Sequence, residues 1–177
     1  MSDPTKRAAE PAAGVTRGES ADDPAQMSVV YLLRSVAFEL NAFGATFASA
    51  NGLHVTDLRA IVELLDAERA GQPASPGWLG RRLGLGSAAV TAVVDRLERL
   101  GHVQRESDPA DRRRVRLLVT PAAKDLGWTF FGPLIDGVLA VTRAFDDVEL
   151  ATVRRFLTDV AETVKAHAGG LADATRT

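Results

Sequence analysis

The sequence predicts a mainly helical fold of the α+β kind, with the element order α-α-α-α-β-β-α-α in 177 residues. Three observations support this order. Two helical segments, at 78–83 and 87–100, flank the turn Gly84-Leu85-Gly86. Two β-like runs follow, at 102–107 and 112–120, and an Asp-Pro turn joins them. Apolar residues with heptad spacing mark helices near both ends of the chain.

The elements before the glycine turn are a tail and two helices. Residues 1–26 lack a periodic apolar stripe and are rich in proline, alanine and acidic residues, so we expect a disordered tail. A second helix is predicted from Thr56, its expected N-cap, to about Arg69, and a proline-rich loop follows at 71–77. The first helix is predicted over 28–50, because apolar residues recur at alternating spacings of four and three: Val29, Leu33, Val36, Leu40, Phe43 and Phe47.

Two long helices are predicted after the β-like runs. Pro121 stands at a first-turn position and opens a helix that reaches about Ala144. Asp146-Asp147 begins the last helix, where heptad spacing returns at Leu150, Val153, Leu157, Val160 and Val164. The two seams predict that 28–50 and 121–168 form a helical dimerisation region. The alternative is that both seams are buried inside one monomer.

The stretch 55–120 has the pattern of a winged helix-turn-helix domain, in which the hairpin at 103–119 is the wing. Residues 76–120 contain nine arginines and five acidic residues, a local charge of +4, although the whole chain has a formal charge of −2. Such a basic face attracts phosphates, so the pattern predicts binding to double-stranded DNA. The alternative is a solvated arginine-rich hairpin with no partner.

Composition and spacing exclude other classes of protein. The chain has no cysteine, which removes disulfides and thiolate metal sites. No apolar run approaches the roughly 18 residues of a membrane span, and 1–26 lack the apolar middle of a secretory signal, so we expect a cytoplasmic protein without a membrane partner. His54, His102 and His167 have no metal-like spacing, and no nucleophile and base stand near each other, so neither a cofactor nor an enzyme is expected.

A dinucleotide-binding fold also fails on context. Residues 84–89 match the fingerprint G-x-G-x-x-A. That fingerprint requires a preceding strand within a βαβ unit, whereas here a helix precedes it and a hairpin follows.

Three segments are the most specific in the chain: AVTAVVDRLERLG at 89–101, DPADRR at 108–113 and LLVT at 117–120. They resemble the MarR family of bacterial transcription regulators, and the resemblance extends over about 28–168. It implies a homodimeric winged-helix DNA-binding protein, commonly a repressor, with a dimer formed by the helices at the two chain ends. It also implies that small aromatic or anionic effectors relieve DNA binding.

The resemblance implies a recognition helix at 87–100, and the N-terminal part of such a helix enters the major groove. Base contacts are therefore expected from Ser87, Ala88, Thr91 and Arg96. The family's Asp-x-Arg wing signature corresponds to Asp111 and Arg113, which implies that Arg113 enters the minor groove. Phosphate contacts are expected from Arg81, Arg82, Arg99, Arg105, Arg112 and Arg114.

Three positions in the predicted DNA-binding region, Asp111, Ala92 and Trp78, allow more than one interpretation or depart from the family's pattern. Asp111 either braces Arg113 or caps the turn. Ala92 stands where similar recognition helices commonly have a polar residue or arginine, and Trp78 occupies a position that is usually polar. Ala92 and the charge of −2 favour a rival function, a winged-helix protein–protein interaction module without specific DNA binding, whereas the basic hairpin favours a DNA-binding regulator.

Aromatic residues crowd the helix that begins at Pro121. Core packing is the default interpretation of Trp128, Phe130 and Phe131. The alternative is an effector pocket, with walls and polar groups supplied by Phe43, Phe47, His54, Arg59, Trp128 and Phe131. In that pocket His54 and Arg59 would hold a carboxylate or phenolate.

Overall fold

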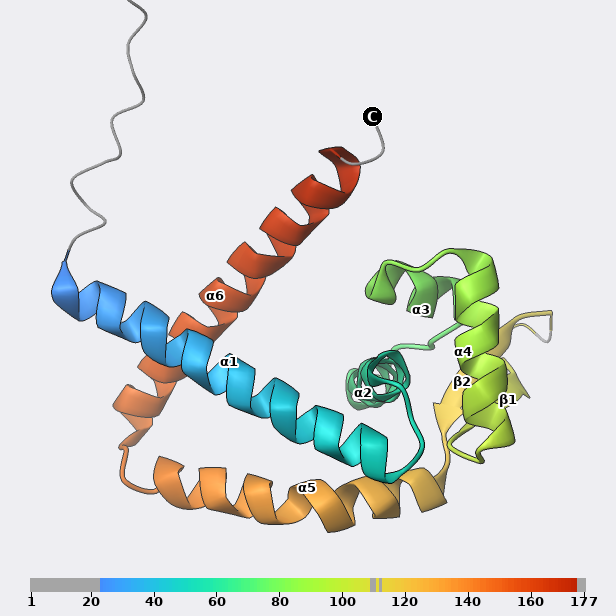
Figure 1. Cartoon of the computed structure of the whole chain (residues 1–177), viewed down its shortest axis with the longest axis horizontal. Coiled ribbons are helices and arrows are strands. Elements are labelled where there is room, and N and C mark those ends of the chain that lie inside the picture. Colours follow the sequence, from blue (N-terminus) through green and yellow to red (C-terminus); the bar gives the residue numbers. More distant parts are fainter. Residues whose placement is uncertain (1–22, 109–110, 112, 175–177) are drawn as a thin grey trace, which may run out of the picture. The chain divides into compact units, whose positions relative to one another are not determined.

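The computed structural model describes residues 23–108, 111 and 113–174 (Figure 1). The predicted α+β class and element order are confirmed. The chain divides into two units, Met1–Val55 and Thr56–Thr177, which are described one at a time. The elements are α1 (Pro24–Ala50), α2 (Val55–Arg69), α3 (Pro76–Leu83), α4 (Ser87–Arg99), β1 (Val103–Ser107), β2 (Val115–Val119), α5 (Pro121–Thr142) and α6 (Asp147–Ala174).

Helix α1 begins earlier than its apolar pattern indicates. The Ala25 N–H donates to Oδ1 of Asp23 at 3.0 Å, and Pro24 occupies the first turn, where its missing N–H costs nothing. The predicted tail over 1–26 is therefore wrong for its last residues, which are helical, and 1–22 lie outside the described residues. A heptad pattern shows where packing begins, whereas a capping residue decides where the helix begins.

The second unit contains the helix-turn-helix. Ser75 caps α3 by accepting from the Trp78 N–H at 3.2 Å, and Pro76 follows at the first position. The helix ends at Gly84, whose φ of 69° is left-handed and favours glycine. Helix α4 then packs against α3 and β1. Thr56 is not an N-cap as predicted, because α2 already begins at Val55.

The two strands form an antiparallel hairpin, as the two β-like runs predict. Val103 pairs with Val119, and Ser107 pairs with Val115. Alternation places Val103, Leu117 and Val119 in the core, together with Leu79, Val94 and Leu97 of the helices. The Leu117 N–H donates to the Ala74 carbonyl at 2.7 Å, so the loop after α2 also holds β2.

Thr120 connects the hairpin to α5. Its hydroxyl donates to the Gly101 carbonyl at 2.7 Å and accepts from the Ala123 N–H at 3.2 Å. Lys124 pairs with Glu68 of α2 at 2.5 Å. The first turn of α5 is thus attached to the winged-helix body from two sides.

The last helix starts with a reciprocal capping box. The Glu149 N–H donates to Oδ1 of Asp146 at 2.8 Å, and the Asp146 N–H donates to Oε2 of Glu149 at 2.9 Å. This cap confirms the predicted start. The helix continues to Ala174, beyond the predicted end at 168.

Gly80 of α3 lies close to α4 and to the turn between the two helices. A methyl group at Gly80 would lie 3.0 Å from Cγ2 of Val90 and 3.1 Å from the Leu85 carbonyl oxygen. We therefore expect Gly80→Ala to lower the free energy of unfolding by about 1–2 kcal/mol, measured by urea denaturation. A matched control is Gly77→Ala in the same helix, where the added methyl would meet only Nη1 of Arg81 at 4.0 Å. Equal stability of the two variants would contradict this packing.

Candidate nucleic-acid interface

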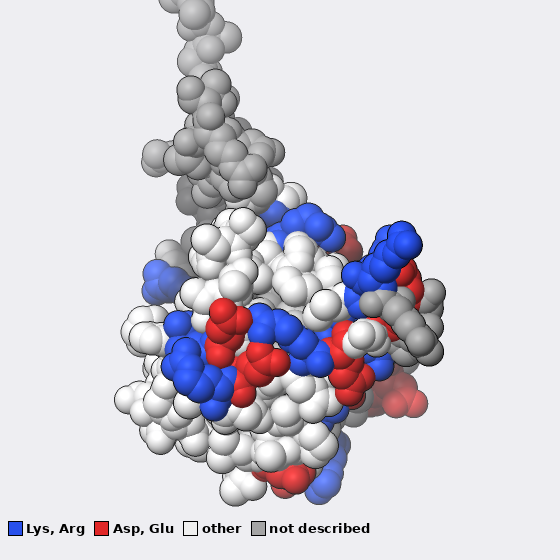
Figure 2. Space-filling view, turned by 90° about the vertical axis from the view of Figure 1, so that its right-hand side faces the viewer, with Lys and Arg blue, Asp and Glu red and all other residues white. Residues whose placement is uncertain are grey.

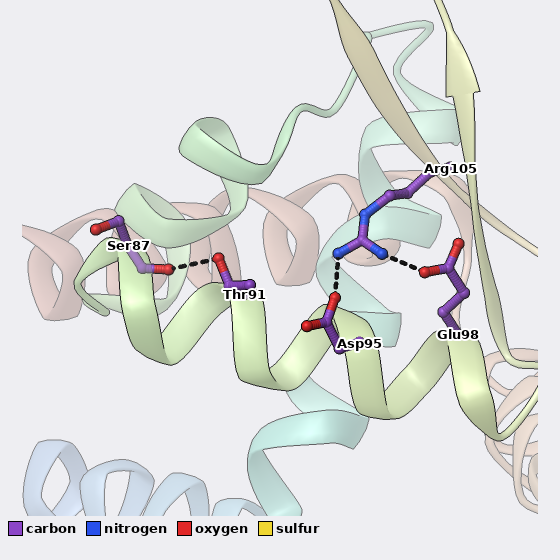
Figure 3. A network of polar contacts seen from close by, with 5 residues as sticks. All are labelled: Ser87, Thr91, Asp95, Glu98 and Arg105. Atoms are coloured by element: carbon purple, nitrogen blue, oxygen red, sulfur yellow. Dashed lines mark hydrogen bonds and ion pairs between the residues drawn. The ribbon is translucent and has the colours of Figure 1, made fainter.

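The first two turns of α4 present small groups to solvent. Ser87, Ala88 and Thr91 are exposed, whereas the opposite face of the helix is buried through Val90, Val93, Val94 and Leu97. The Thr91 hydroxyl donates to the Ser87 carbonyl at 3.0 Å, which leaves its oxygen able to accept (Figure 3). The N-cap is Gly86, and no side chain caps the helix. The N–H groups of the first turn therefore remain available to a phosphate.

Arg96 forms an ion pair within the protein that the sequence did not predict. Its Nε and Nη2 donate to both carboxylate oxygens of Asp57 in α2, at 2.8 Å and 2.5 Å. Asp57 is fully buried, and the hydrogen bond to it raises the pKa of Arg96. This fork uses two of the five guanidinium N–H donors and ties α4 to α2, and the expected base contact of Arg96 stays a prediction.

Arg82 is also engaged within the protein. Its Nε lies 2.6 Å from Oε2 of Glu63 in α2, and its Cζ lies 5.9 Å from the centre of the Trp78 ring. Both contacts favour one orientation of the guanidinium. The sequence alone does not explain why a tryptophan occupies this usually polar position. In the structure, the Trp78 ring helps to orient the Arg82 guanidinium one turn later in α3.

Arg105 joins the wing to the recognition helix. Its Nη2 lies 2.5 Å from Oδ1 of Asp95, and its Nη1 forms a second ion pair with Glu98 (Figure 3). Hydrogen bonding to Asp95 raises the pKa of Arg105. Two carboxylates of α4 thus hold the guanidinium for which the sequence predicts a phosphate contact, and that contact stays a prediction.

At the wing tip, the structure decides between the two roles of Asp111. Its Oδ1 accepts from the Arg113 N–H at 3.0 Å, and its backbone carbonyl accepts from the Arg114 N–H at 2.8 Å. Oδ2 lies 3.5 Å from Nε of Arg114. Asp111 therefore caps the turn and leaves the Arg113 side chain exposed. Arg112 lies outside the described residues.

The basic surface is smaller than the sequence predicts. Five arginines of this region pair with acidic side chains: Arg82, Arg96, Arg105, Arg114 and Arg116. Figure 2 shows basic and acidic side chains interleaved on one face of the molecule. Among the residues that the structure describes, Arg81, Arg99 and Arg113 are exposed and form no side-chain ion pair with another described residue. Apart from Asp111, which lies three residues before Arg114, the acidic partners lie in other elements, where no local motif identifies them.

The predicted effector residues fall in both units. In the first, Phe43 is half-buried, Phe47 is buried and His54 is exposed. In the second, Arg59 is exposed, Phe131 packs edge-on against Phe130 with ring centres 5.2 Å apart, and Trp128 is 64% exposed. Such exposure does not fit plain core packing of Trp128. Within the described part of the chain, no cluster of three or more metal-binding side chains occurs.

The recognition helix, its supporting helices and the two-stranded wing define a winged helix-turn-helix protein. Residues 51–114 match the family model described as "MarR family". YcgE, an uncharacterised HTH-type transcriptional regulator of Bacillus subtilis (strain 168), is 34% identical over 140 residues, which are 79% of this chain and 88% of that protein. The chain belongs to the MarR family of transcription regulators, whose members are not enzymes.

Solved structures show the same fold. A mutant of MepR from S. aureus matches with a TM-score of 0.64 at 15% identity, covering 77% of this chain and 96% of that one. A MarR family protein from Bacillus stearothermophilus matches with a TM-score of 0.59 at 21% identity, covering 81% and 98%. The S. aureus MepR–DNA complex matches with a TM-score of 0.51 at 16% identity, covering 76% and 98%. None of the helices built from the described residues has the length and apolar character that a membrane crossing requires.

Proposed function

We propose that this protein is a homodimeric, ligand-responsive repressor that binds a pseudo-palindromic site in double-stranded DNA. The observation that supports this most directly is the uncapped, exposed start of α4 beside a wing with an exposed arginine. The start of α4 fits a major groove about 12 Å wide, and the exposed arginine of the wing fits a narrow minor groove. MepR, which shares this fold, has been seen in complex with DNA.

The DNA contacts that we propose combine the expectations from the sequence with the exposure of the described side chains. Ser87 and Thr91 would read base edges, and Ala88 would contact a thymine methyl group. Arg113 would enter the minor groove. The exposed arginines Arg81 and Arg99 would contact phosphates, and we also place Arg112 and Arg114 of the wing in this group. Arg82 is held by Glu63 and would contribute less.

A gel shift with promoter DNA flanking the encoding gene tests this function. We expect a specific complex that survives an excess of unrelated duplex, since specific sites are typically bound at least about 10³-fold more tightly than random ones. Absence of any complex at low salt would overturn the proposal and favour the protein–protein interaction module.

Exposed seams on the long helices support a dimer. In the single chain, Val153, Leu157 and Val164 of α6 remain exposed, as do Val36 and Leu40 of α1. We expect light scattering to show a dimer at micromolar concentration, because unpartnered apolar stripes of this length favour association. A two-fold dimer would then place its recognition helices about 34–36 Å apart, one turn of DNA. A monomer in this light-scattering measurement would contradict the proposed dimer.

The effector response is proposed for an aromatic or anionic small molecule. The exposed Trp128 and the Phe130–Phe131 pair lie in the same helix, α5, and the exposed Arg59 of the same unit is a polar candidate; these residues support this class of ligand. MepR has been seen bound to ethidium bromide. We expect aromatic acids such as salicylate to dissociate the DNA complex, and we expect Phe131→Ala to weaken this response while DNA binding without ligand is preserved. Unchanged DNA binding and tryptophan fluorescence across a broad panel would contradict an aromatic site.

A further inference from the structure

One stripe of α4 contains both the proposed base-reading residues and two carboxylates. Ser87, Thr91 and Asp95 follow one another at a spacing of four, and Glu98 lies three residues further on. Residues at these spacings share a face of a helix. Figure 3 shows them along the same side of α4, with the Arg105 guanidinium next to Asp95 and Glu98. The DNA-facing stripe would therefore end in two negative charges if Arg105 were absent.

Arg105 compensates these charges from another element. It belongs to β1, and its two terminal nitrogens bind one carboxylate each. The three side chains are between 32% and 53% exposed, so the charges act on a solvent-facing surface where a polyanion would approach. The fork also restrains the base of the wing against the recognition helix, because both guanidinium branches are held at once.

We propose that Arg105 is a positioning residue for DNA binding. It neutralises Asp95 and Glu98 on the DNA-facing stripe and holds the wing and α4 as one body, without itself contacting DNA. This inference rests on the proposed function, since it presumes that α4 and the wing lie against a duplex. It removes Arg105 from the set of phosphate contacts and gives it an indirect effect on affinity.

A thermodynamic cycle of variants tests the proposal. The cycle combines Arg105→Met, which keeps a similar apolar stem, with the double substitution Asp95→Asn/Glu98→Gln, which removes the negative charges. Kd for the promoter duplex is measured by fluorescence anisotropy for wild type, each variant and the triple variant. Arg113→Met in both backgrounds is the matched control, because its side chain is proposed to contact DNA directly.

We expect Arg105→Met to raise Kd about tenfold in the wild-type background and less than about threefold once the carboxylates are neutral. Arg113→Met should raise Kd by the same factor in both backgrounds. A direct phosphate contact by Arg105 would instead give equal losses in both backgrounds, and a salt slope reduced by about one contact. Either of those results would overturn the proposal.

A second measurement separates this inference from the proposed function. Amide hydrogen exchange in β1 and β2 of the free protein should become faster in Arg105→Met and stay unchanged in Arg113→Met, since only the first loses a restraint on the wing. Unchanged exchange in Arg105→Met would overturn the positioning role. Failure of the wild type to bind duplex DNA would overturn the proposed function, and the exchange result would still decide whether Arg105 holds the wing.

Discussion

Arg96→Met is expected to lower the free energy of unfolding by about 3 kcal/mol. The substitution leaves the carboxylate of Asp57 fully buried without the guanidinium that binds both of its oxygens. Breaking a buried ion pair by removing one partner costs about 3–5 kcal/mol, and the lower end applies because the Arg96 side chain is 26% exposed. Urea denaturation followed by circular dichroism measures this change.

Two comparisons isolate the cause of that loss. Arg99→Met removes an exposed arginine from the same helix and should change stability by less than about 0.5 kcal/mol. The double variant Arg96→Met/Asp57→Ala should be more stable than Arg96→Met alone, because it also removes the buried carboxylate that has lost the Arg96 guanidinium. If Arg96→Met were as stable as Arg99→Met, the bridge between α2 and α4 would not be a structural element.

Arg113→Ala is expected to weaken specific DNA binding about 30-fold while the fold stays intact. The Arg113 side chain is exposed, and only its backbone N–H takes part in the turn that Asp111 caps. Loss of a groove contact costs about 1–3 kcal/mol of discrimination between DNA sequences. The middle of this range corresponds to a loss of affinity of about 30-fold. Anisotropy titrations with the promoter duplex and with an unrelated duplex measure the two affinities.

The matched control is Arg99→Ala, at an exposed position proposed to contact a phosphate. This variant should weaken specific and unrelated DNA about equally and reduce the salt slope by about one contact. Wild-type binding curves for Arg113→Ala would show that the wing does not contact DNA. Equal losses on both duplexes would move Arg113 from the groove to the backbone.

Local signals predicted the elements well. Gly84 with its left-handed φ and Pro121, which opens α5, each act on residues close to them in the sequence. Heptad spacing placed α1 and α6, although the caps at Asp23 and Asp146 set their exact starts. Together with the segments at 89–101, 108–113 and 117–120, these signals were enough to recognise the family.

By itself, the sequence determined the element order, the winged-helix class and the family, because these depend on capping, turn chemistry and periodicity between near neighbours. Only the tertiary structure decided which arginines are available to DNA. The partner of Arg96 lies 39 residues earlier, and that of Arg82 lies 19 residues earlier. An ion pair depends on which carboxylate the fold brings within reach, so residue type alone cannot distinguish an arginine that binds DNA from one that binds its own protein.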